Sequence, residues 1–522
     1  MFEVRCHKRH TPLAVLSSVV LKLLLSLAVP SCARVLELEA YAVTDPDAST
    51  PLEGACSTTS ECDEESVCVE ATHQCVALKS EDCTTVTGDY RQDDAIIIGS
   101  LYAFGGAQED TSTARRNAAL LAIHEIAGAG GVPRREGSAS TRPLVMLSCD
   151  ASADLLRASR HLVEDLHVPA IVGPNASQDT LDISQQVSVP GGTLLITPTA
   201  LASSVADLAD NGLTWQMVPT DVQRGPLLTR ELQNMARELK QARNLEQVKL
   251  AAVFRDDALG IGTRTSLNEL TINDLPLAAL VSQGLARVDA YDLSTPDQQA
   301  TVRAYAAFAP DIVVLAGTSE LIVNVLVPLE RAWPMGQPKP HYMLIDSLKN
   351  IELLDAVAID DDLRKRVRGT GITTSPRSKP VYDAFQLSYQ LAYPGISPEL
   401  GGLGPSYDAT YAIAYALAAT QDRPISGQSV AAGLRMLSGG REEIDVQAVT
   451  LLAAFASLSK NEPISAIGTF GPLAWGPNGA VLGGTLELWC IERRAGHLSY
   501  QSSGLTLDLA TGRLEGDYKQ CE

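Results

Sequence analysis

Residues 95–99 read AIIIG, an apolar and mostly β-branched run that ends at a glycine, and this pattern predicts a buried strand. Apolar residues at helical spacing follow over residues 112–127 and predict a helix. Further apolar runs over residues 144–147, 170–172 and 194–196 each precede a segment that is compatible with a helix. Strands that alternate with helices in this way predict an α/β fold with a doubly wound parallel sheet.

The same alternation starts again after the turn-rich residues 218–225. Strand-like runs occupy residues 249–254 (KLAAVF), 311–315 (DIVVL) and 342–345. A chain of 522 residues exceeds the size of one compact core, so more than one structural unit is expected. The sequence therefore predicts two α/β lobes in one chain.

The beginning of the chain has the pattern of an export signal. Three cations precede an apolar run over residues 13–29, which predicts a signal peptide over residues 1–31. Residues 29–32 (VPSC) resemble a bacterial lipobox, so Cys32 is the expected lipidation site. Cleavage near Ala33 without a lipid and an uncleaved anchor are the alternatives. Each of the three exports the chain, and lipidation would hold it on the periplasmic or cell-surface face of a bacterial membrane.

Charge and motifs exclude several classes of function. The chain has 41 Lys and Arg against 62 Asp and Glu, and its net charge of -21 repels nucleic acid. The stretches GAGGVP and GIGTRT lack the last glycine of a dinucleotide-binding loop, and the chain contains no G-x-S-x-G, H-E-x-x-H or P-loop lysine motif. We therefore expect no catalysis, no cofactor, no metal and no nucleic-acid partner.

Cysteines gather after an acidic, turn-rich tether over residues 32–55. Five of them fall between Cys56 and Cys83 and predict a disulfide-stapled module over residues 56–88. Zinc is the alternative, but the segment has no C-x-x-C pair and only one histidine. Cys83 and Cys149 remain for a long-range bridge. The first four cysteines are expected to pair among themselves: Cys56, Cys62, Cys68 and Cys75.

The end of the chain has a different pattern from the rest. Residues 486–491 and 505–509 resemble the strands of a hairpin rather than parallel strands. Cys490 and Cys521 bracket them, and we expect these two cysteines to form a disulfide.

The order of motifs along residues 94–522 resembles the type 1 periplasmic binding proteins, which carry branched-chain amino acids and related solutes to ABC transporters. The motifs are IIIGSLYAFGG, HEIAGAGGV, RPLVMLSCDAS, VPAIVGPNASQDT, GGTLLITPTALASS, VPTDVQRGP and FGPLAWGPNGAVLGG. The resemblance implies two lobes joined by a hinge. Lobe 1 would comprise about residues 94–218 and 371–470, and lobe 2 about residues 219–370 and 471–522.

The resemblance also implies which residues of the first lobe meet the ligand. Ligands of open α/β sheets lie beyond the carboxyl ends of the strands, where these motifs end. Ser177 matches a position suited to a ligand carboxylate, and Thr199 and Ala200 match positions that hold the main-chain groups of an amino acid. A helix cap at Ser177 and a plain strand-to-helix connection at Thr199 are the alternatives.

At the hinge side of the cleft, Asp346 matches the family's acid for a ligand ammonium, and Asp408 is a candidate for a second carboxylate in the wall. Either residue could instead be a surface or capping residue. Leu201 stands where amino-acid binders commonly have a threonine donor, and Leu259 and Thr318 stand where they often have aromatic lids. We expect Thr318 to face a ligand that is more polar than leucine.

Two functions from different classes follow. The first is an extracytoplasmic lipoprotein that captures a small polar, amino-acid-like ligand for an ABC importer or for sensing. The second is a cell-envelope interaction lipoprotein that keeps the fold without binding small molecules. Ser177, Thr199 and Asp346 favour the first function, and the departures from the family pattern favour the second.

Overall fold

The computed structural model describes residues 55–521 except residues 107–108, 135–139, 296 and 422. The expected signal peptide, Cys32 and nearly all of the expected tether lie outside the described residues. Among the residues that are described, no helix combines the length and the apolar character needed to cross a membrane.

The first lobe is built on a six-stranded sheet with the order β10-β9-β8-β4-β7-β3. Its strands are β3 (Cys83–Thr87), β4 (Ile96–Tyr102), β7 (Leu144–Asp150), β8 (Ala170–Val172), β9 (Leu194–Thr197) and β10 (Thr214–Gln216). Neighbouring strands are parallel except β3, which runs antiparallel to β7. The first parallel strand along the chain, β4, thus lies between the second, β7, and the third, β8. The order of the sheet therefore reverses between β4 and β8, where doubly wound folds bind ligands.

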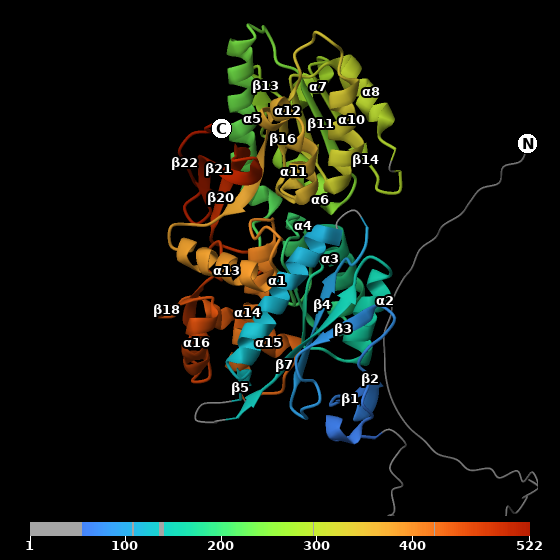
Figure 1. Cartoon of the computed structure of the whole chain (residues 1–522), viewed down its shortest axis with the longest axis vertical. Helices are drawn as coiled ribbons and strands as arrows, with labels where there is room; N and C mark the ends of the chain where they lie inside the picture. Colours follow the sequence, from blue (N-terminus) through green and yellow to red (C-terminus); the bar gives the residue numbers. More distant parts are fainter. Residues whose placement is uncertain (1–54, 107–108, 135–139, 296, 422, 522) are drawn as a thin grey trace, which may run out of the picture. The chain divides into compact units, whose positions relative to one another are not determined.

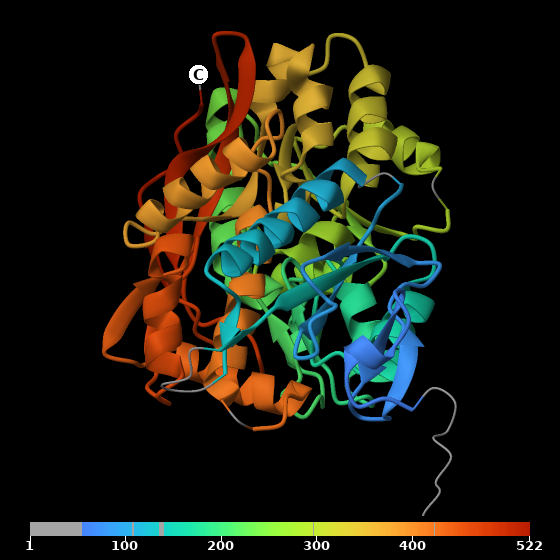
Figure 2. The same cartoon turned by 60° about the horizontal axis from the view of Figure 1, so that its bottom comes forward.

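The second lobe is built on an eight-stranded sheet with the order β14-β11-β15-β16-β17-β20-β21-β22. Its strands are β11 (Leu250–Arg255), β14 (Ala286–Tyr291), β15 (Ile312–Ala316), β16 (His341–Leu344), β17 (Val367–Thr373), β20 (Thr485–Arg494), β21 (His497–Asp508) and β22 (Arg513–Glu515). The five strands from β14 to β17 in this order are parallel, and the last three are antiparallel. This sheet reverses its order between β11 and β15. The long hairpin of β20 and β21, red in Figure 2, contains both runs that the sequence predicted as hairpin strands, except residue 509.

Helices cover both sheets, and the chain passes between the lobes three times (Figure 1). The helices of the first lobe are α1 (Glu109–Gly128), α2 (Leu155–Arg160), α3 (Ser177–Ile183), α4 (Ser203–Ala206), α13 (Lys379–Ala392), α14 (Leu403–Thr420), α15 (Gly427–Leu434) and α16 (Leu451–Leu458). Those of the second lobe are α5 (Asp221–Ala242), α6 (Ala258–Ser266), α7 (Leu277–Ser282), α8 (Gln299–Phe308), α9 (Ser319–Leu321), α10 (Val327–Ala332), α11 (Ile351–Ala358) and α12 (Asp361–Arg366). Short two-stranded pairs complete the structure: β5 (Val132–Pro133) with β6 (Thr141–Arg142), β12 (Thr271–Ile272) with β13 (Leu275–Pro276), and β18 (Glu442–Asp445) with β19 (Ile464–Ile467). The α/β class with two doubly wound lobes, predicted from the sequence, is confirmed.

Helix α14 is the central helix of the first lobe. All 18 of its residues are buried, and it packs against α1 and α15. Its sequence (LGPSYDATYAIAYALAAT) is apolar or small on nearly every side, which is the pattern of a helix without a solvent-facing surface.

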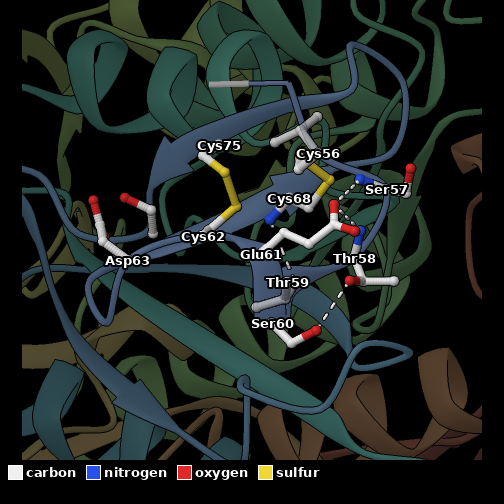
Figure 3. Close-up of a disulfide and its surroundings, with 12 residues drawn as sticks. Cys56, Ser57, Thr58, Thr59, Ser60, Glu61, Cys62, Asp63, Cys68 and Cys75 are labelled. Atoms are coloured by element: carbon white, nitrogen blue, oxygen red, sulfur yellow. Dashed lines mark hydrogen bonds between the residues drawn. A yellow bond between two sulfur atoms is a disulfide. The ribbon is translucent and has the colours of Figure 1, made fainter. Parts of the chain in front are cut away.

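The Cys-rich segment begins as a small hairpin of β1 (Ser66–Val69) and β2 (Gln74–Ala77) and ends in β3 of the first sheet. Its first four cysteines form the disulfides Cys56–Cys68 and Cys62–Cys75 (Figure 3). The sulfur atoms of Cys56, Cys62 and Cys75 lie within 4.8 Å of one another, but each belongs to a disulfide and none is free to bind zinc. The carboxylate of Glu61 accepts hydrogen bonds from the backbone N–H groups of Ser57 and Thr58, as drawn in Figure 3.

Two further disulfides tie distant segments together. Cys83–Cys149 joins β3 to β7, and Cys490–Cys521 joins β20 to the last described residue. The end of the chain is also held by Tyr518, whose ring lies 3.7 Å from the guanidinium carbon of Arg368.

Candidate functional site

The strand ends of both sheets open into one cavity of about 470 Å³, a size that suits a small molecule. On the first-lobe side it is lined by the residues that follow β4, β7, β8 and β9 and by the beginning of α1. On the second-lobe side it is lined by the residues that follow β11, β15 and β16. Both reversal points, β4/β8 and β11/β15, therefore face the same space.

Ser177 is the first residue of α3 and lines the cavity. Its side chain is buried, and its Oγ accepts hydrogen bonds from the backbone N–H groups of Leu201 and Ala202, each at 3.2 Å. Because the oxygen accepts both bonds, the hydroxyl hydrogen is left to donate. Ser177 thus connects two loops and offers one donor to the cavity.

Thr199 and Ala200 have different positions. Thr199 lines the cavity, and its hydroxyl donates to the backbone oxygen of Asn175 at 2.8 Å. Ala200 does not line it: its N–H donates to the Thr197 hydroxyl at 3.2 Å, and its carbonyl accepts from Gln216 at 2.9 Å. The expectation that Ala200 offers main-chain groups to a ligand is therefore wrong, because both of these groups are already bonded within the first lobe.

Asp346 lies on the second-lobe side, at the start of the short helix η5 (Asp346–Leu348), and lines the cavity. One carboxylate oxygen accepts from the hydroxyl of Thr370 at 2.5 Å, and the other lies 3.0 Å from Nε of Arg224. The second contact is an ion pair without hydrogen-bond alignment, so Nε and Nη1 of Arg224 have no acceptor among the described residues. Asp346 is thus already the counter-ion of a buried arginine.

Thr318 lines the cavity after β15, and its hydroxyl belongs to a network of hydrogen bonds. It donates to Glu320 and accepts from Nη1 of Arg255 at 3.1 Å. The guanidinium of Arg255, which also lines the cavity, pairs with Asp257 at 2.7 Å. The network fixes the orientation of Thr318 and leaves its hydroxyl little freedom to reach a ligand.

Asp408 does not line the cavity, and its expected place in the wall is wrong. It lies in the buried helix α14, where its Oδ2 accepts from the backbone N–H and the hydroxyl of Thr469 at 2.8 and 2.7 Å. Burial raises the pKa of Asp408 to about 7, although the bonds from Thr469 lower it. A β-carbon at Gly468 would lie 2.5 Å from Oδ2, so only glycine permits this close approach of the loop. Asp408 therefore positions Thr469, which lines the cavity, from behind.

Charged residues that the sequence analysis did not identify complete the wall. Arg115 on α1 and Arg224 on α5 are buried cations in the cavity, and Lys349 pairs with Glu487 at 3.1 Å. Asp179 on α3 is a buried acid whose pKa burial raises to about 6. Of these, Arg224 and Asp179 had a signal, because they lie in the quoted motifs VPTDVQRGP and VPAIVGPNASQDT.

Apolar side chains form the remainder of the lining near these groups. Leu201 and Leu259 line the cavity and pack into the same buried cluster of the second lobe. Neither can donate a hydrogen bond, so recognition in this region depends on the charged and hydroxyl groups.

The chain matches the family model described as "Periplasmic binding protein" over residues 95–439, more than half of its length. Among solved structures it resembles the branched-chain amino acid transporter substrate-binding protein LivJ of Streptococcus pneumoniae, in complex with isoleucine. The identity is 16%, the TM-score is 0.56, and the match covers 78% of this chain and 99% of that one. It also resembles an ABC transporter solute-binding protein of Rhodopseudomonas palustris BisB5 in complex with 3,4-dihydroxybenzoic acid. Here the identity is 15%, the TM-score is 0.57, and the coverage is 80% and 98%. No curated protein matches the chain.

Proposed function

Because this chain belongs to the type 1 periplasmic binding protein family, we propose that it captures a small polar ligand with a carboxylate group between its two lobes. It would do so outside the cytoplasm, for an ABC importer or for a sensing system, and it would catalyse nothing. The observation that carries the proposal is the cavity of about 470 Å³, into which both reversal points of the sheets and several buried hydrogen-bond donors face.

A carboxylate is the chemical group that the donors of the first lobe suit. The hydroxyl hydrogen of Ser177 and the guanidinium of Arg115 both belong to the first-lobe wall. Charge-assisted hydrogen bonds of this kind are about twice as strong as neutral ones. The ligands in the two similar structures, isoleucine and 3,4-dihydroxybenzoic acid, share a carboxylate and little else. Amino acids and aromatic acids are accordingly the two candidate classes.

Asp346 distinguishes these two classes. If it binds a ligand ammonium, the variant Asp346→Asn should weaken binding of isoleucine by about tenfold or more, since hydrogen bonds to charged groups contribute about 1.5 to 3 kcal/mol. If it serves only as the counter-ion of Arg224, the same variant should strengthen binding of benzoate, because it leaves an uncompensated cation in the wall. Asp355→Asn, at an exposed position of α11, is the matched control.

Binding itself is tested by calorimetry on purified protein that has been stripped of ligand by mild unfolding and refolding. The probes are isoleucine, glutamate, benzoate and 3,4-dihydroxybenzoate. A ligand at about a hundred times its Kd stabilises the protein by roughly 2.7 kcal/mol, so a melting experiment should agree with the calorimetry. If no member of a wider library of amino acids, small acids, short peptides and sugars binds, the proposal is wrong and an interaction lipoprotein without a ligand is the better interpretation.

We also propose that Cys32 carries a lipid that holds the protein at the membrane. The support is the VPSC motif after an apolar run. The variant Cys32→Ala should move from the membrane fraction to the soluble envelope fraction. A variant that stays in the membrane without being cleaved contradicts lipidation at this residue.

A further inference from the structure

Arg115 differs from the other cations of the cavity because no carboxylate neutralises it. Its side chain is 7% exposed, and its Nε donates to the backbone oxygen of Gly401 at 2.8 Å. Arg224, Arg255 and Lys349 each have a carboxylate within 3.1 Å. No carboxylate of the described residues lies within ion-pair distance of Arg115.

The charge of Arg115 is therefore available to a ligand. Burial lowers the pKa of Arg115 to about 10, so the guanidinium is still protonated at neutral pH. Tyr102 and Glu352 partly offset this lowering of the Arg115 pKa; Glu352, on α11, is the one carboxylate among these causes, it lies beyond ion-pair distance, and burial raises its own pKa. A buried and unpaired charge is costly unless an opposite charge joins it, and here an anionic ligand can supply that charge.

Arg115 also lies at the corner where the first lobe would hold a carboxylate. A β-carbon at Gly402 would lie 2.4 Å from Cγ2 of Thr199 and 2.6 Å from Nε of Arg115, so these two side chains are neighbours. Leu201, whose position commonly holds a threonine in amino-acid binders, lines the same cavity and provides no side-chain donor. The guanidinium of Arg115 is therefore a charged donor beside Thr199, at a wall to which the side chain of Leu201 adds no donor.

The opposite end of the cavity offers little to an ammonium group. The carboxylate of Asp346 is engaged by Arg224 and Thr370, and that of Glu487 by Lys349. The two other acids in the lining, Asp179 and Glu399, form no ion pair with the residues that the structure describes, and burial raises the pKa of both, so it favours their neutral forms.

Resting on the proposed function, we propose that Arg115 makes the cavity selective for small acids with a net negative charge over zwitterionic amino acids. The class includes monocarboxylic acids, dicarboxylic acids and acidic amino acids. The guanidinium pairs with the carboxylate at the first-lobe corner, and the two acids of the lining that lie on second-lobe elements, Asp346 and Glu487, already have cations as partners.

The test uses pairs of probes that have similar shapes and different charges: 4-methylpentanoate with leucine, and glutamate with glutamine. Calorimetry on the full chain in detergent should show binding at least tenfold tighter for the anionic member of one or both pairs. Arg115→Gln should lower the affinity for the anion by about 10- to 100-fold and remove most of this preference. Arg116→Gln is the matched control, because Arg116 is the next residue of α1, stacks on Phe104 at 4.4 Å and does not line the cavity.

Three results overturn the inference, and they separate it from the proposed function. Equal or tighter binding of the zwitterions by the wild-type protein refutes the selectivity while leaving the proposed function intact. A preference that Arg115→Gln keeps refutes the role of this residue. Binding of none of the four probes by folded protein overturns the inference as well, and the wider library then decides the proposed function. If Arg115→Gln does not fold, Arg115→Lys and the wild-type salt dependence replace it, since added salt should weaken binding of the anions more.

Discussion

Replacing Asp408 with Asn should make the first lobe less sensitive to pH. Asp408 is fully buried in α14, and its Oδ1 has no hydrogen-bond partner among the described residues. Its pKa in the folded protein is about 7, against 3.8 for an unperturbed aspartate. At pH values between 3.8 and about 7, Asp408 keeps its proton in the folded protein and releases it in the unfolded chain. Stability therefore falls as pH rises, and the loss is complete above pH 7.

The size of the effect follows from the two pKa values. Between about pH 5 and about pH 8.5, a group with these values lowers the free energy of unfolding by about 3 kcal/mol. This is an upper bound, because relaxation of the protein and entry of water lessen the cost of a buried charge. The asparagine carries no charge at any pH, and its side-chain oxygen can still accept both bonds from Thr469.

The measurement is urea unfolding of wild-type protein and Asp408→Asn at both pH values. As the pH is raised, we expect the free energy of unfolding of the variant to increase by about 1 to 3 kcal/mol relative to that of the wild type. All other titrating groups cancel in this comparison, and Asp355→Asn should show no such gain because Asp355 is exposed. A difference between Asp408→Asn and wild type that is the same at both pH values would refute the argument that Asp408 holds a proton in the fold.

Other substitutions test the cavity and the packing of the second lobe. Ser177→Ala should weaken binding of a carboxylate probe about tenfold in calorimetry, because two backbone N–H groups lose their acceptor and the ligand loses a donor; unchanged binding would mean that Ser177 only connects the two loops. Replacing both Cys490 and Cys521 with Ser opens a connection across 31 residues and should cost about 3 kcal/mol in urea unfolding, whereas an unaltered midpoint would contradict this. Glu231→Gln leaves the buried Arg368 without its full counter-charge and should lower the free energy of unfolding, measured with urea, by about 3 to 5 kcal/mol. Adding Arg368→Met to this variant should restore most of the loss, and no recovery would contradict the argument.

The sequence predicts the strand ends well, and therefore also the loops that meet the ligand. Ser177, Thr199, Thr318 and Asp346 each follow a predicted strand, and all four line the cavity. These positions can be predicted from a short stretch of sequence, because each strand is a short apolar run and the residues that follow it form the loop at its carboxyl end. Ala200 follows a strand as well, but its backbone N–H and carbonyl form hydrogen bonds with Thr197 and Gln216 of the first lobe, which the sequence does not reveal.

The counter-ions could not be predicted, because they depend on segments that are distant in the sequence. Arg224 and Asp346 are separated by more than a hundred residues, as are Lys349 and Glu487. Arg115 lies within a long helix, where an arginine usually faces solvent, and only the packing of the residues around 401 and 402 buries it. For Asp408 a signal existed: a carboxylate in a helix that is apolar on nearly every side is buried in the core.

The attachment of the Cys-rich hairpin to the first sheet has a mechanical consequence. Strand β3 is paired along its length with β7, and the Cys83–Cys149 bond adds a covalent link between the same two strands. A pull applied at Cys56 therefore reaches β7 through the Cys83–Cys149 bond, because Cys83 is the first residue of β3 and the hydrogen-bonded pairs of the ladder lie beyond it. A covalent bond therefore has to break or be reduced before such a pull can separate β3 from β7, so the hairpin keeps its attachment to the first sheet as long as this disulfide is intact.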